Sequence, residues 1–310
     1  MAGTPPMEGY DVLVTGGAGF IGGHLARTLA PDNDVTILDR DDEDPPQGTS
    51  LVEGDVRDAT LVQDAVAGTD VVFHEAALVS VEESIERPVE SHDINVSGTL
   101  NVLEAARDAG ARVVLASSAA VYGHPESTPI PETHPLEPTS PYGLDKVAAD
   151  HYARLYHDLY GLETIALRYF NVYGPGQSGE YAGVIDVFRR QAERGEPITV
   201  HGDGSQTRDF VHVDDVVRAN LLAATADTDT DAVGRAYNVG TGESVTIREL
   251  AELVRDAAGS DSAIEHFDPR EGDIDHSRAD VDRARRELAY EPTVGLREGL
   301  ERLLGSAKYD

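Results

Sequence analysis

Tyr142 and Lys146 have residue types and a spacing that suit proton-transfer chemistry. They stand four residues apart at the start of a segment with helical periodicity, so we expect their side chains to share one helix face. A cation beside a phenol favours the phenolate. Free tyrosine has a pKa of about 10, and lowering it by about three units requires roughly 4 kcal/mol of preferential stabilisation of the charged form. The pair therefore predicts an acid–base group.

A tyrosine and a lysine at this spacing also occur by chance, as an aromatic residue on a helix beside a solvated lysine. Lysine usage favours the functional interpretation, because Lys146 and Lys308 are the only lysines in a chain that otherwise uses arginine. Ser118 supports it too, because it follows a buried-strand pattern and strand carboxyl ends line the ligand crevice in α/β folds. Its hydroxyl could hydrogen-bond a reacting hydroxyl or ketone.

A glycine-rich turn predicts a dinucleotide site. Gly16, Gly19 and Gly22 form a GxxGxxG pattern between a strand pattern and a helical pattern. The first two glycines allow a tight turn and close approach to a pyrophosphate, and Gly22 allows close helix–strand packing. Glycine-rich turns also occur for packing reasons alone, but this context favours the dinucleotide. A positively charged nicotinamide ring would then help Lys146 to stabilise the phenolate of Tyr142, while Lys146 donates to the nicotinamide ribose.

Asp39 favours NAD as the dinucleotide. It ends the second strand pattern, seventeen positions after Gly22, where its carboxylate can accept hydrogen bonds from the adenosine ribose and would repel a 2′-phosphate. The neighbouring Arg40 leaves NADP as an alternative. Asp55 could meet the adenine amino group, or it could be an ordinary loop aspartate.

The first half of the chain alternates strand and helix patterns, which is typical of a parallel sheet with helices on both faces. Uninterrupted apolar runs indicate buried strands at residues 11–15, 35–39, 71–74, 113–117 and 164–169. Helical patterns lie between them at residues 21–30, 59–67, 89–109 and 141–160. We expect Ser140 to cap the last helix, with Pro141 at its first position. The sequence thus predicts an α/β fold with a Rossmann-type doubly wound parallel sheet.

After about Tyr173, glycine and proline divide the chain into shorter elements, which predicts a smaller C-terminal α/β substrate lobe. Helical patterns in this part cover residues 184–194, 214–226, 247–258, 281–288 and 296–304. We predict an NAD-binding domain at residues 8–175, to which the chain returns around 208–240. The substrate lobe would comprise residues 176–207 and 241–308.

Composition narrows the range of partners. The 310 residues carry 57 acidic and 25 basic side chains, a formal net charge of -32, which argues against nucleic-acid binding. The excess is spread along the chain and resembles the surface of halophilic proteins. The absence of cysteine and the scattered spacing of eleven histidines predict no metal site. Without a signal-peptide or membrane-span pattern, we expect a soluble cytoplasmic protein.

Several segments together resemble the extended short-chain dehydrogenase/reductase family, and within it the UDP-glucose 4-epimerase group of NAD-dependent epimerases and dehydratases. The similarity covers almost the whole chain. The segments are TGGAGFIG at residues 15–22, NVSGTLNVLEAA at 95–106, SSAAVYG at 117–123, YGLDK at 142–146, RYFNVYGP at 168–175, GDGSQTRDFVHVDD at 202–215, YNVGTG at 237–242 and REGDI at 270–274.

The resemblance implies roles for matching positions. Tyr142 would be the acid–base group, Lys146 its helper and Ser118 its hydrogen-bonding partner. Further NAD contacts would come from Phe20, Ile21, Val56, Ala76, Asn95, Ser117 and Tyr169. Asn171, Arg208 and Arg270 match positions that hold the nucleotide diphosphate, and arginines suit phosphate as bidentate donors. Either arginine could instead form a surface ion pair.

The family mechanism implies that Tyr142 takes a proton from a sugar hydroxyl while hydride passes to NAD, and that the ketone turns over before hydride returns. Related dehydratases carry an Asp-Glu pair where this chain has Ala119 and Ala120. Related uronate decarboxylases carry a glutamate in the same strand-end segment, and Ala120 lacks that too. A sugar-nucleotide epimerase is therefore the first prediction, followed by a decarboxylase and then a reductase or a non-catalytic NAD-binding protein.

Ser277 bears on the choice of sugar. In family epimerases a bulky residue seven positions after the arginine that matches Arg270 restricts the sugar pocket, and a small one admits N-acetylated sugars. We therefore expect UDP-N-acetylglucosamine to be accepted beside UDP-glucose. The resemblance also implies a homodimer that pairs the helices at residues 89–109 and 141–160 of each subunit.

Overall fold

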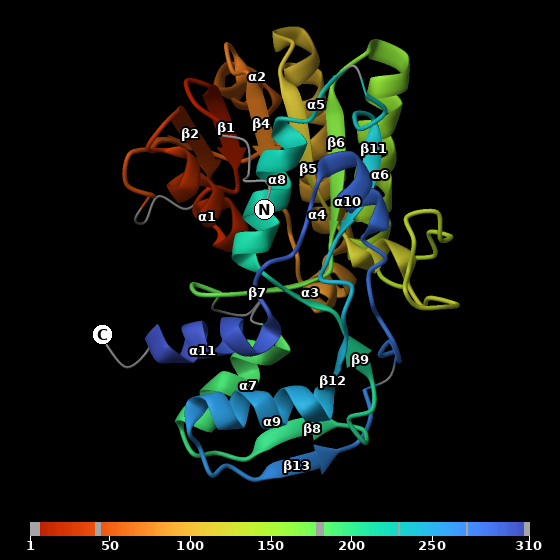
Figure 1. Cartoon of the computed structure of the whole chain (residues 1–310). Coiled ribbons are helices and arrows are strands. Elements are labelled where there is room, and N and C mark those ends of the chain that lie inside the picture. The colour runs from red at the N-terminus through yellow and green to blue at the C-terminus, as the bar shows by residue number, and fades with distance from the viewer. Residues whose placement is uncertain (1–6, 41–44, 178–182, 229, 271, 307–310) are drawn as a thin grey trace.

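A seven-stranded sheet forms the centre of the computed structural model, which describes residues 7–40, 45–177, 183–228, 230–270 and 272–306 (Figure 1). Its strand order is β11-β6-β5-β4-β1-β2-β3, and every pair is parallel. The strands are β1 (Asp11–Thr15), β2 (Asp34–Asp39), β3 (Ser50–Glu53), β4 (Val71–His74), β5 (Arg112–Ser118), β6 (Thr164–Tyr169) and β11 (Arg235–Val239). The chain builds outward from β1 to β3 and then crosses back to β4. Ligands of open α/β sheets bind at such a reversal, beyond the carboxyl ends of the strands.

The predicted doubly wound α/β fold is confirmed. Each of the five predicted strands agrees with the structure to within one residue at either end. Their nearly continuous apolar sequence follows from burial on both faces, since neighbouring residues such as Leu13 and Val14 are both fully buried.

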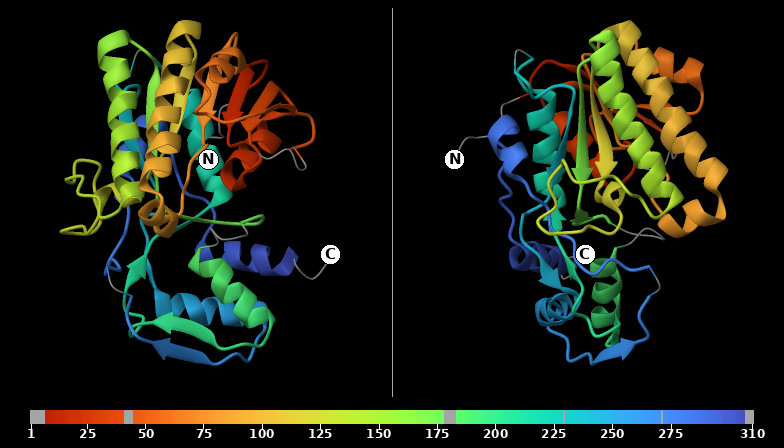
Figure 2. Two further views of the ribbon diagram at one scale, coloured as in Figure 1. Left: turned by 180° about the vertical axis from the view of Figure 1, so that it is seen from behind. Right: turned by 90° about the vertical axis from the view of Figure 1, so that its right-hand side faces the viewer.

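Helices cover both faces of the sheet (Figure 2). On one face Val12 and Val14 pack in a core with residues of α1 (Phe20–Leu29) and α8 (Val213–Ala224). On the other, Leu13 packs in a core with residues of α2 (Ala59–Val66), α5 (Gly98–Ala109) and α6 (Pro141–Tyr160). Ser140 caps α6 as predicted, because its Oγ accepts from Gly143 N at 3.1 Å.

The single helix predicted at residues 89–109 is wrong in detail. The chain instead forms α3 (Val81–Glu86), α4 (Pro88–His92), a π-helical turn at Asp93–Ser97 and then α5. Gly98 N donates to Asp93 O, five residues earlier, whereas an α-helix would use the carbonyl four residues earlier. The wider turn accommodates Asn95, whose side-chain amide pairs with the main chain of Leu78 outside the helix. Helical periodicity continues through the turn, so the pattern could not reveal it.

A smaller group of elements lies below the main sheet in Figure 1. The elements are α7 (Val184–Glu193), β8 (Ile198–His201), β9 (Thr207–Arg208), β12 (Val245–Thr246), α9 (Ile247–Ala258), β13 (Ile264–Phe267) and α11 (Leu296–Ser306). Its apolar core contains residues of helices α7, α9 and α11 and of strand β8. Strands β8 and β13 pair in parallel, and β9 pairs with β12 antiparallel. Between the two groups, β7 (Asn171–Tyr173) pairs with β10 (Phe210–His212).

Helices α8 and α10 (Asp282–Leu288) both pack on the main sheet, although they follow parts of the smaller group in the sequence. The predicted return of the chain around residues 208–240 corresponds to α8 and β11. In addition, α10, which the prediction assigned to the smaller lobe, contacts β11 and α8. Its buried Ala284 and Leu288 belong to the sheet core, which explains the placement. The end of the predicted lobe at residue 308, together with Lys308, lies outside the described residues.

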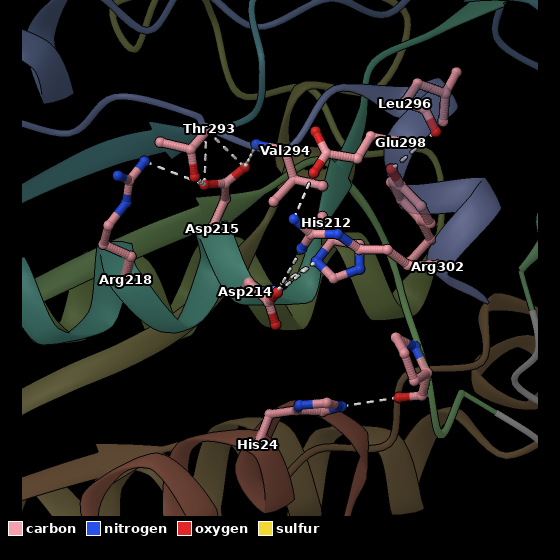
Figure 3. Close-up of polar contacts among 12 residues, drawn as sticks. His24, His212, Asp214, Asp215, Arg218, Thr293, Val294, Leu296, Glu298 and Arg302 are labelled. Carbon is pink, nitrogen blue, oxygen red and sulfur yellow. Dashed lines mark hydrogen bonds and ion pairs between the residues drawn. The ribbon is translucent and has the colours of Figure 1, made fainter. Parts of the chain in front are cut away.

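A buried carboxylate ties the segment before α11 to α8. Asp215, which is almost fully buried, accepts hydrogen bonds from Thr293 N, Thr293 Oγ1 and Val294 N at 2.8–3.0 Å (Figure 3). Arg218 completes the carboxylate's partners at 3.1 Å. Because these bonds satisfy the buried charge, the segment that leads into α11 is fixed against the main sheet. None of the helices in the described ranges combines the length and the apolar character needed to cross a membrane.

Candidate active site

The turn between β1 and α1 needs its glycines. Gly16 has φ +70°, and a Cβ on it would lie 2.7 Å from Ala76 N. A Cβ on Gly22 would overlap the carbonyl oxygen of Gly16. Phe20 and Ile21 open α1, so their N–H groups have no acceptor within the helix. A backbone cradle that tolerates no side chain, at a helix N-terminus, fits a pyrophosphate.

Asp39, the last residue of β2, lies against this turn. Its Oδ2 accepts from Ala18 N at 2.9 Å, which places a carboxylate next to the glycine cradle, where the sequence predicts an adenosine ribose. Asp55 carries an ion pair. Its carboxylate pairs with Arg57 at 2.6 Å, with Arg40 3.8 Å away, and the hydrogen bonds of Arg57 hold the pKa of Asp55 below its usual value. The side chain of the next residue, Val56, packs into the core against Gly98.

A directed hydrogen-bond chain joins β1, β4 and α5. Thr99 Oγ1 donates to Asn95 O at 2.7 Å, so it must accept from His74 Nε2 at 3.0 Å. His74 Nδ1 is then the acceptor for Thr15 Oγ1 at 2.7 Å, and Thr15 Oγ1 accepts from Ala76 N at 3.3 Å. Burial lowers the pKa of His74 to about 3, so the ring stays neutral. The chain thereby fixes the backbone at Ala76, a predicted cofactor contact.

Asn95 and Ser117 direct their polar groups into the protein. The amide of Asn95 forms two hydrogen bonds with the main chain of Leu78, of 2.9 and 3.0 Å, and so positions the loop after β4. Ser117 Oγ donates to the buried Asp150 at 3.3 Å. The same carboxylate is paired with Arg168 at 2.8 Å. The side chains of these two predicted cofactor contacts are therefore hydrogen-bonded within the protein.

The structure brings the three predicted catalytic residues together. Tyr142 hydrogen-bonds to Ser118, which ends β5 and whose Oγ also accepts from Ala120 N at 3.1 Å. Lys146, one turn along α6, lies 6.0 Å from the centre of the Tyr142 ring and donates to Ala116 O at 2.8 Å. Phenol, hydroxyl and ammonium thus meet at the carboxyl ends of the central strands.

The predicted lowering of the pKa of Tyr142 rests on the ammonium and the nicotinamide ring together, and the protein's own groups do not supply it. Burial raises the pKa of Tyr142, the hydrogen bond from Ser118 opposes this, and the charge of Glu75 adds to it. Burial also lowers the pKa of Lys146 to about 8, which weakens the expected help from the ammonium. Stabilisation of a phenolate therefore requires a further positive charge, such as the nicotinamide ring of an oxidised dinucleotide.

Glu75 is a site residue that sequence reasoning did not select. Its Oε1 accepts from Tyr169 OH at 2.8 Å, and Asn220 Nδ2 donates to the same hydroxyl at 2.8 Å. The proton of the Tyr169 hydroxyl, a predicted cofactor contact, is therefore donated to Glu75. The available signal was an acidic residue directly after a buried strand, at a ligand-facing sheet edge.

The predicted diphosphate ligands lie in and beside the smaller group of elements. Asn171 Nδ2 donates to Asp209 O at 3.0 Å, and Arg208 pairs with Asp273 and donates to Thr207 O at 2.8 Å. Arg270 lines a cavity of about 470 Å³ with residues that include Asp273. Ser277 is buried, and its N donates to Thr207 O at 3.0 Å, beside Arg208. Glu271, within the REGDI segment, lies outside the described residues.

Comparisons with known proteins agree with this geometry. A family model described as the NAD dependent epimerase/dehydratase family matches residues 12–240. The UDP-glucose 4-epimerase of Mycolicibacterium smegmatis is 40% identical over 305 residues, 93% of this chain and 95% of that protein. UDP-glucuronic acid decarboxylase 1 of Arabidopsis thaliana is 34% identical over 94% of this chain and 68% of that protein. A solved UDP-N-acetylglucosamine 4-epimerase from Methanobrevibacter ruminantium M1, in complex with UDP-N-acetylmuramic acid, superposes with a TM-score of 0.90 at 34% identity, over 96% of this chain and 98% of the other.

Gly22→Ala tests the cradle, and Gly23→Ala is its matched control. The new methyl group at position 22 would displace the carbonyl of Gly16, so we expect affinity for NAD, measured by calorimetry, to fall at least about tenfold, the effect of roughly 1.4 kcal/mol. At position 23 the nearest atom is the flexible end of Arg27, 3.3 Å away, so affinity should be retained. Equal affinities in the two variants would contradict the assignment of this turn to the dinucleotide.

Proposed function

The chain belongs to the NAD-dependent epimerase/dehydratase family, and from that premise we propose that it is a UDP-sugar 4-epimerase. NAD is its cofactor. The proposed reaction interconverts UDP-glucose and UDP-galactose through a transient 4-keto sugar while NAD remains bound. The observation that carries the proposal is the meeting of Tyr142, Ser118 and Lys146 at the strand ends, next to the glycine turn.

Each of these residues has a role in the proposed reaction. NAD supplies the acceptor and later the donor of the hydride. Tyr142 takes the proton of the 4-hydroxyl, while Ser118 hydrogen-bonds to the same sugar oxygen and holds it near the phenol. Lys146 provides positive charge beside Tyr142 and donors for the nicotinamide ribose. When the ketone presents its other face, Tyr142 returns the proton and the carbon is inverted.

Ala119 and Ala120 favour epimerisation over the dehydration that related enzymes catalyse. Elimination of water needs an additional acid and base next to Ser118, and this chain has Ala119 and Ala120 at the start of a short 3₁₀ turn. Methyl groups can neither donate nor accept a proton. UDP-glucuronate decarboxylation is the second candidate, favoured by the similarity to the plant decarboxylase.

Arg208 and Arg270 are the proposed diphosphate ligands. They come from β9 and from the segment after β13, and both lie near Asp273. Guanidinium groups bind phosphate oxygens bidentately, and in a chain of net charge -32 such donors are the local source of attraction for an anionic substrate.

Tyr142→Phe tests the proposed reaction. Product analysis by NMR after incubation with NAD and UDP-glucose should show the 4-epimer for the unaltered protein, and the rate should fall about 10²- to 10⁴-fold or more in the variant, because the general acid–base group is lost. Tyr152→Phe on the same helix should retain activity, because the Tyr152 hydroxyl has no hydrogen-bond partner within the described ranges. Release of carbon dioxide from UDP-glucuronate without epimerisation would favour the decarboxylase instead.

Ser277 underlies a finer proposal about the sugar. We propose that its small side chain admits N-acetylated sugars, in keeping with the epimerase from Methanobrevibacter ruminantium that the fold matches. Ser277 lies beside Arg208, so a larger residue there would extend toward the proposed substrate site.

A variant can separate the two sugar classes. Ser277→Tyr should lower kcat/KM for UDP-N-acetylglucosamine by at least about tenfold relative to UDP-glucose, because the added ring competes with the acetyl group for space. Ser277→Ala should leave the ratio unchanged. No turnover of the acetylated sugar by the unaltered protein would refute the proposal.

The expected homodimer remains a proposal, supported by apolar side chains on one face. Leu155, Leu159 and Tyr160 of α6 are exposed by 45%, 61% and 53%, and Val89 of α4 is exposed by 73%. Helix α6 contacts both α4 and α5, so these exposed apolar residues lie on adjoining helices. Such a face, repeated on a second copy, suits a symmetric interface.

Leu159→Asp tests the dimer. Light scattering in molar KCl should report a dimer for the unaltered chain and a monomer for the variant, because a carboxylate at the centre of an apolar interface is costly to bury. Phe267→Asp, at a similarly exposed apolar residue of β13, should remain dimeric. A monomeric mass for the unaltered chain would exclude the proposed interface.

A further inference from the structure

Glu75 occupies a supported position at the end of β4. Its main-chain N donates to Thr15 O at 3.1 Å, which continues the pairing of β4 with β1. Its side chain reaches the face of α8, where Tyr169 OH donates to Oε1 and Asn220 supports Tyr169. Within the described ranges, Oε2 has no hydrogen-bond donor. One oxygen is therefore anchored and the other is available at the ligand-facing edge.

The electrostatic partner of Glu75 is Lys146. Lys146 is only 5% exposed and has one hydrogen-bond acceptor, Ala116 O, among the described residues. Burial lowers the pKa of Lys146, whereas the charges of Glu75 and then Asp145 raise it. Asp145 is already engaged by Ser91 at 2.6 Å and His92 at 3.2 Å. Glu75 is thus the main counter-charge of the ammonium.

We propose that Glu75 is a positioning residue of the active site, whose carboxylate is the counter-charge of Lys146 and favours the positively charged, oxidised nicotinamide over the reduced one. The proposal rests on the proposed function, in which Lys146 donates to the nicotinamide ribose. Glu75 follows His74, which pairs with Leu115 of β5. The next residue of β5, Ala116, is the one whose carbonyl accepts from Lys146. Glu75 therefore lies near the same end of the dinucleotide as Lys146. A negative charge there stabilises a cationic ring and gives nothing to a neutral one.

The charge of Glu75 changes near neutral pH. Burial raises the pKa of Glu75 to about 7, and the hydrogen bond from Tyr169 and the charge of Lys146 oppose that rise. The groups that face it are Tyr142 and Lys146 of α6 and Tyr169 of β6, while the neighbouring His74 is neutral. Because a carboxyl loses its charge as pH falls through its pKa, the preference for oxidised NAD should be full above about pH 8 and should fade toward about pH 6.

Glu75→Gln isolates the charge, because the glutamine oxygen can still accept from Tyr169. Dissociation constants of NAD and NADH for the full chain, measured by calorimetry between about pH 6 and pH 8.5, give the ratio that reports the preference. We expect the ratio at the upper pH to shift at least about tenfold against NAD in this variant, the value for one unit charge as far as about 12 Å from the ring at an effective dielectric of about 20. We also expect the step of the ratio centred near pH 7 to disappear, so that the titration of Lys146, whose pKa falls when the Glu75 charge is removed, is the pH dependence that remains.

Two further variants separate charge from structure. Tyr169→Phe removes the bond that stabilises the carboxylate, so the midpoint of the titration should move to higher pH. Glu82→Gln, at an exposed position on α3, should leave the ratio unaltered. An equal loss of affinity for both forms in Glu75→Gln, or an unchanged ratio, would overturn the proposal while leaving the epimerase intact. Failure of the unaltered chain to bind either form would overturn both.

Discussion

The arrangement at the strand ends depends on keeping one ammonium group charged where little water reaches it. Lys146 is nearly buried, and burial lowers its pKa to about 8 even though the charges of Glu75 and Asp145 oppose that change. A lysine in this position is maintained by a carbonyl oxygen and by two carboxylates that come from separate elements. An ammonium has three N–H groups, and Ala116 O is the one acceptor for them in the described part of the chain. The remaining donors suit the ribose hydroxyls of the proposed ligand, for which the planar fork of arginine is less well suited.

Few groups near the site change their charge as the pH changes. The chain from Ala76 N through Thr15 and His74 to Thr99 has a fixed direction, because His74 stays neutral throughout the physiological range. The backbone of the cradle therefore keeps its geometry as pH changes. Glu75 and Lys146, by contrast, have pKa values near neutrality. The site therefore combines a hydrogen-bond chain that does not titrate with two neighbouring groups that do.

The parts that sequence reasoning predicted well are those determined by local physics. Buried parallel strands read as apolar runs, and the glycines at positions 16 and 22 are required by contacts that no other residue allows. The cap at Ser140 and the spacing of Tyr142 and Lys146 are equally local. Because each of these features lies within one short segment, the residue order alone is enough to locate the catalytic cluster.

The features that sequence reasoning missed depend on contacts between segments far apart in the chain. The π-helical turn exists because Asn95 binds the main chain of Leu78, and Ser117 turns inward because Asp150 lies beneath it. Glu75 becomes part of the site through Tyr169 and Asn220, which lie 94 and 145 positions further along the chain. No periodicity or spacing within one segment contains that information.

The strongly acidic surface poses a problem for a protein whose proposed ligands carry diphosphate groups. A net charge of -32 repels such anions at long range, whereas the N-terminus of α1 and the arginines at positions 208 and 270 attract them only at close range. Salt separates the two effects, because at about 1 M the screening length is only about 3 Å. The repulsion across the surface is then largely removed, while hydrogen-bonded contacts inside the site are screened much less. Concentrated salt would therefore allow a purely local cluster of donors to determine affinity, so that the acidic surface need not compromise substrate binding.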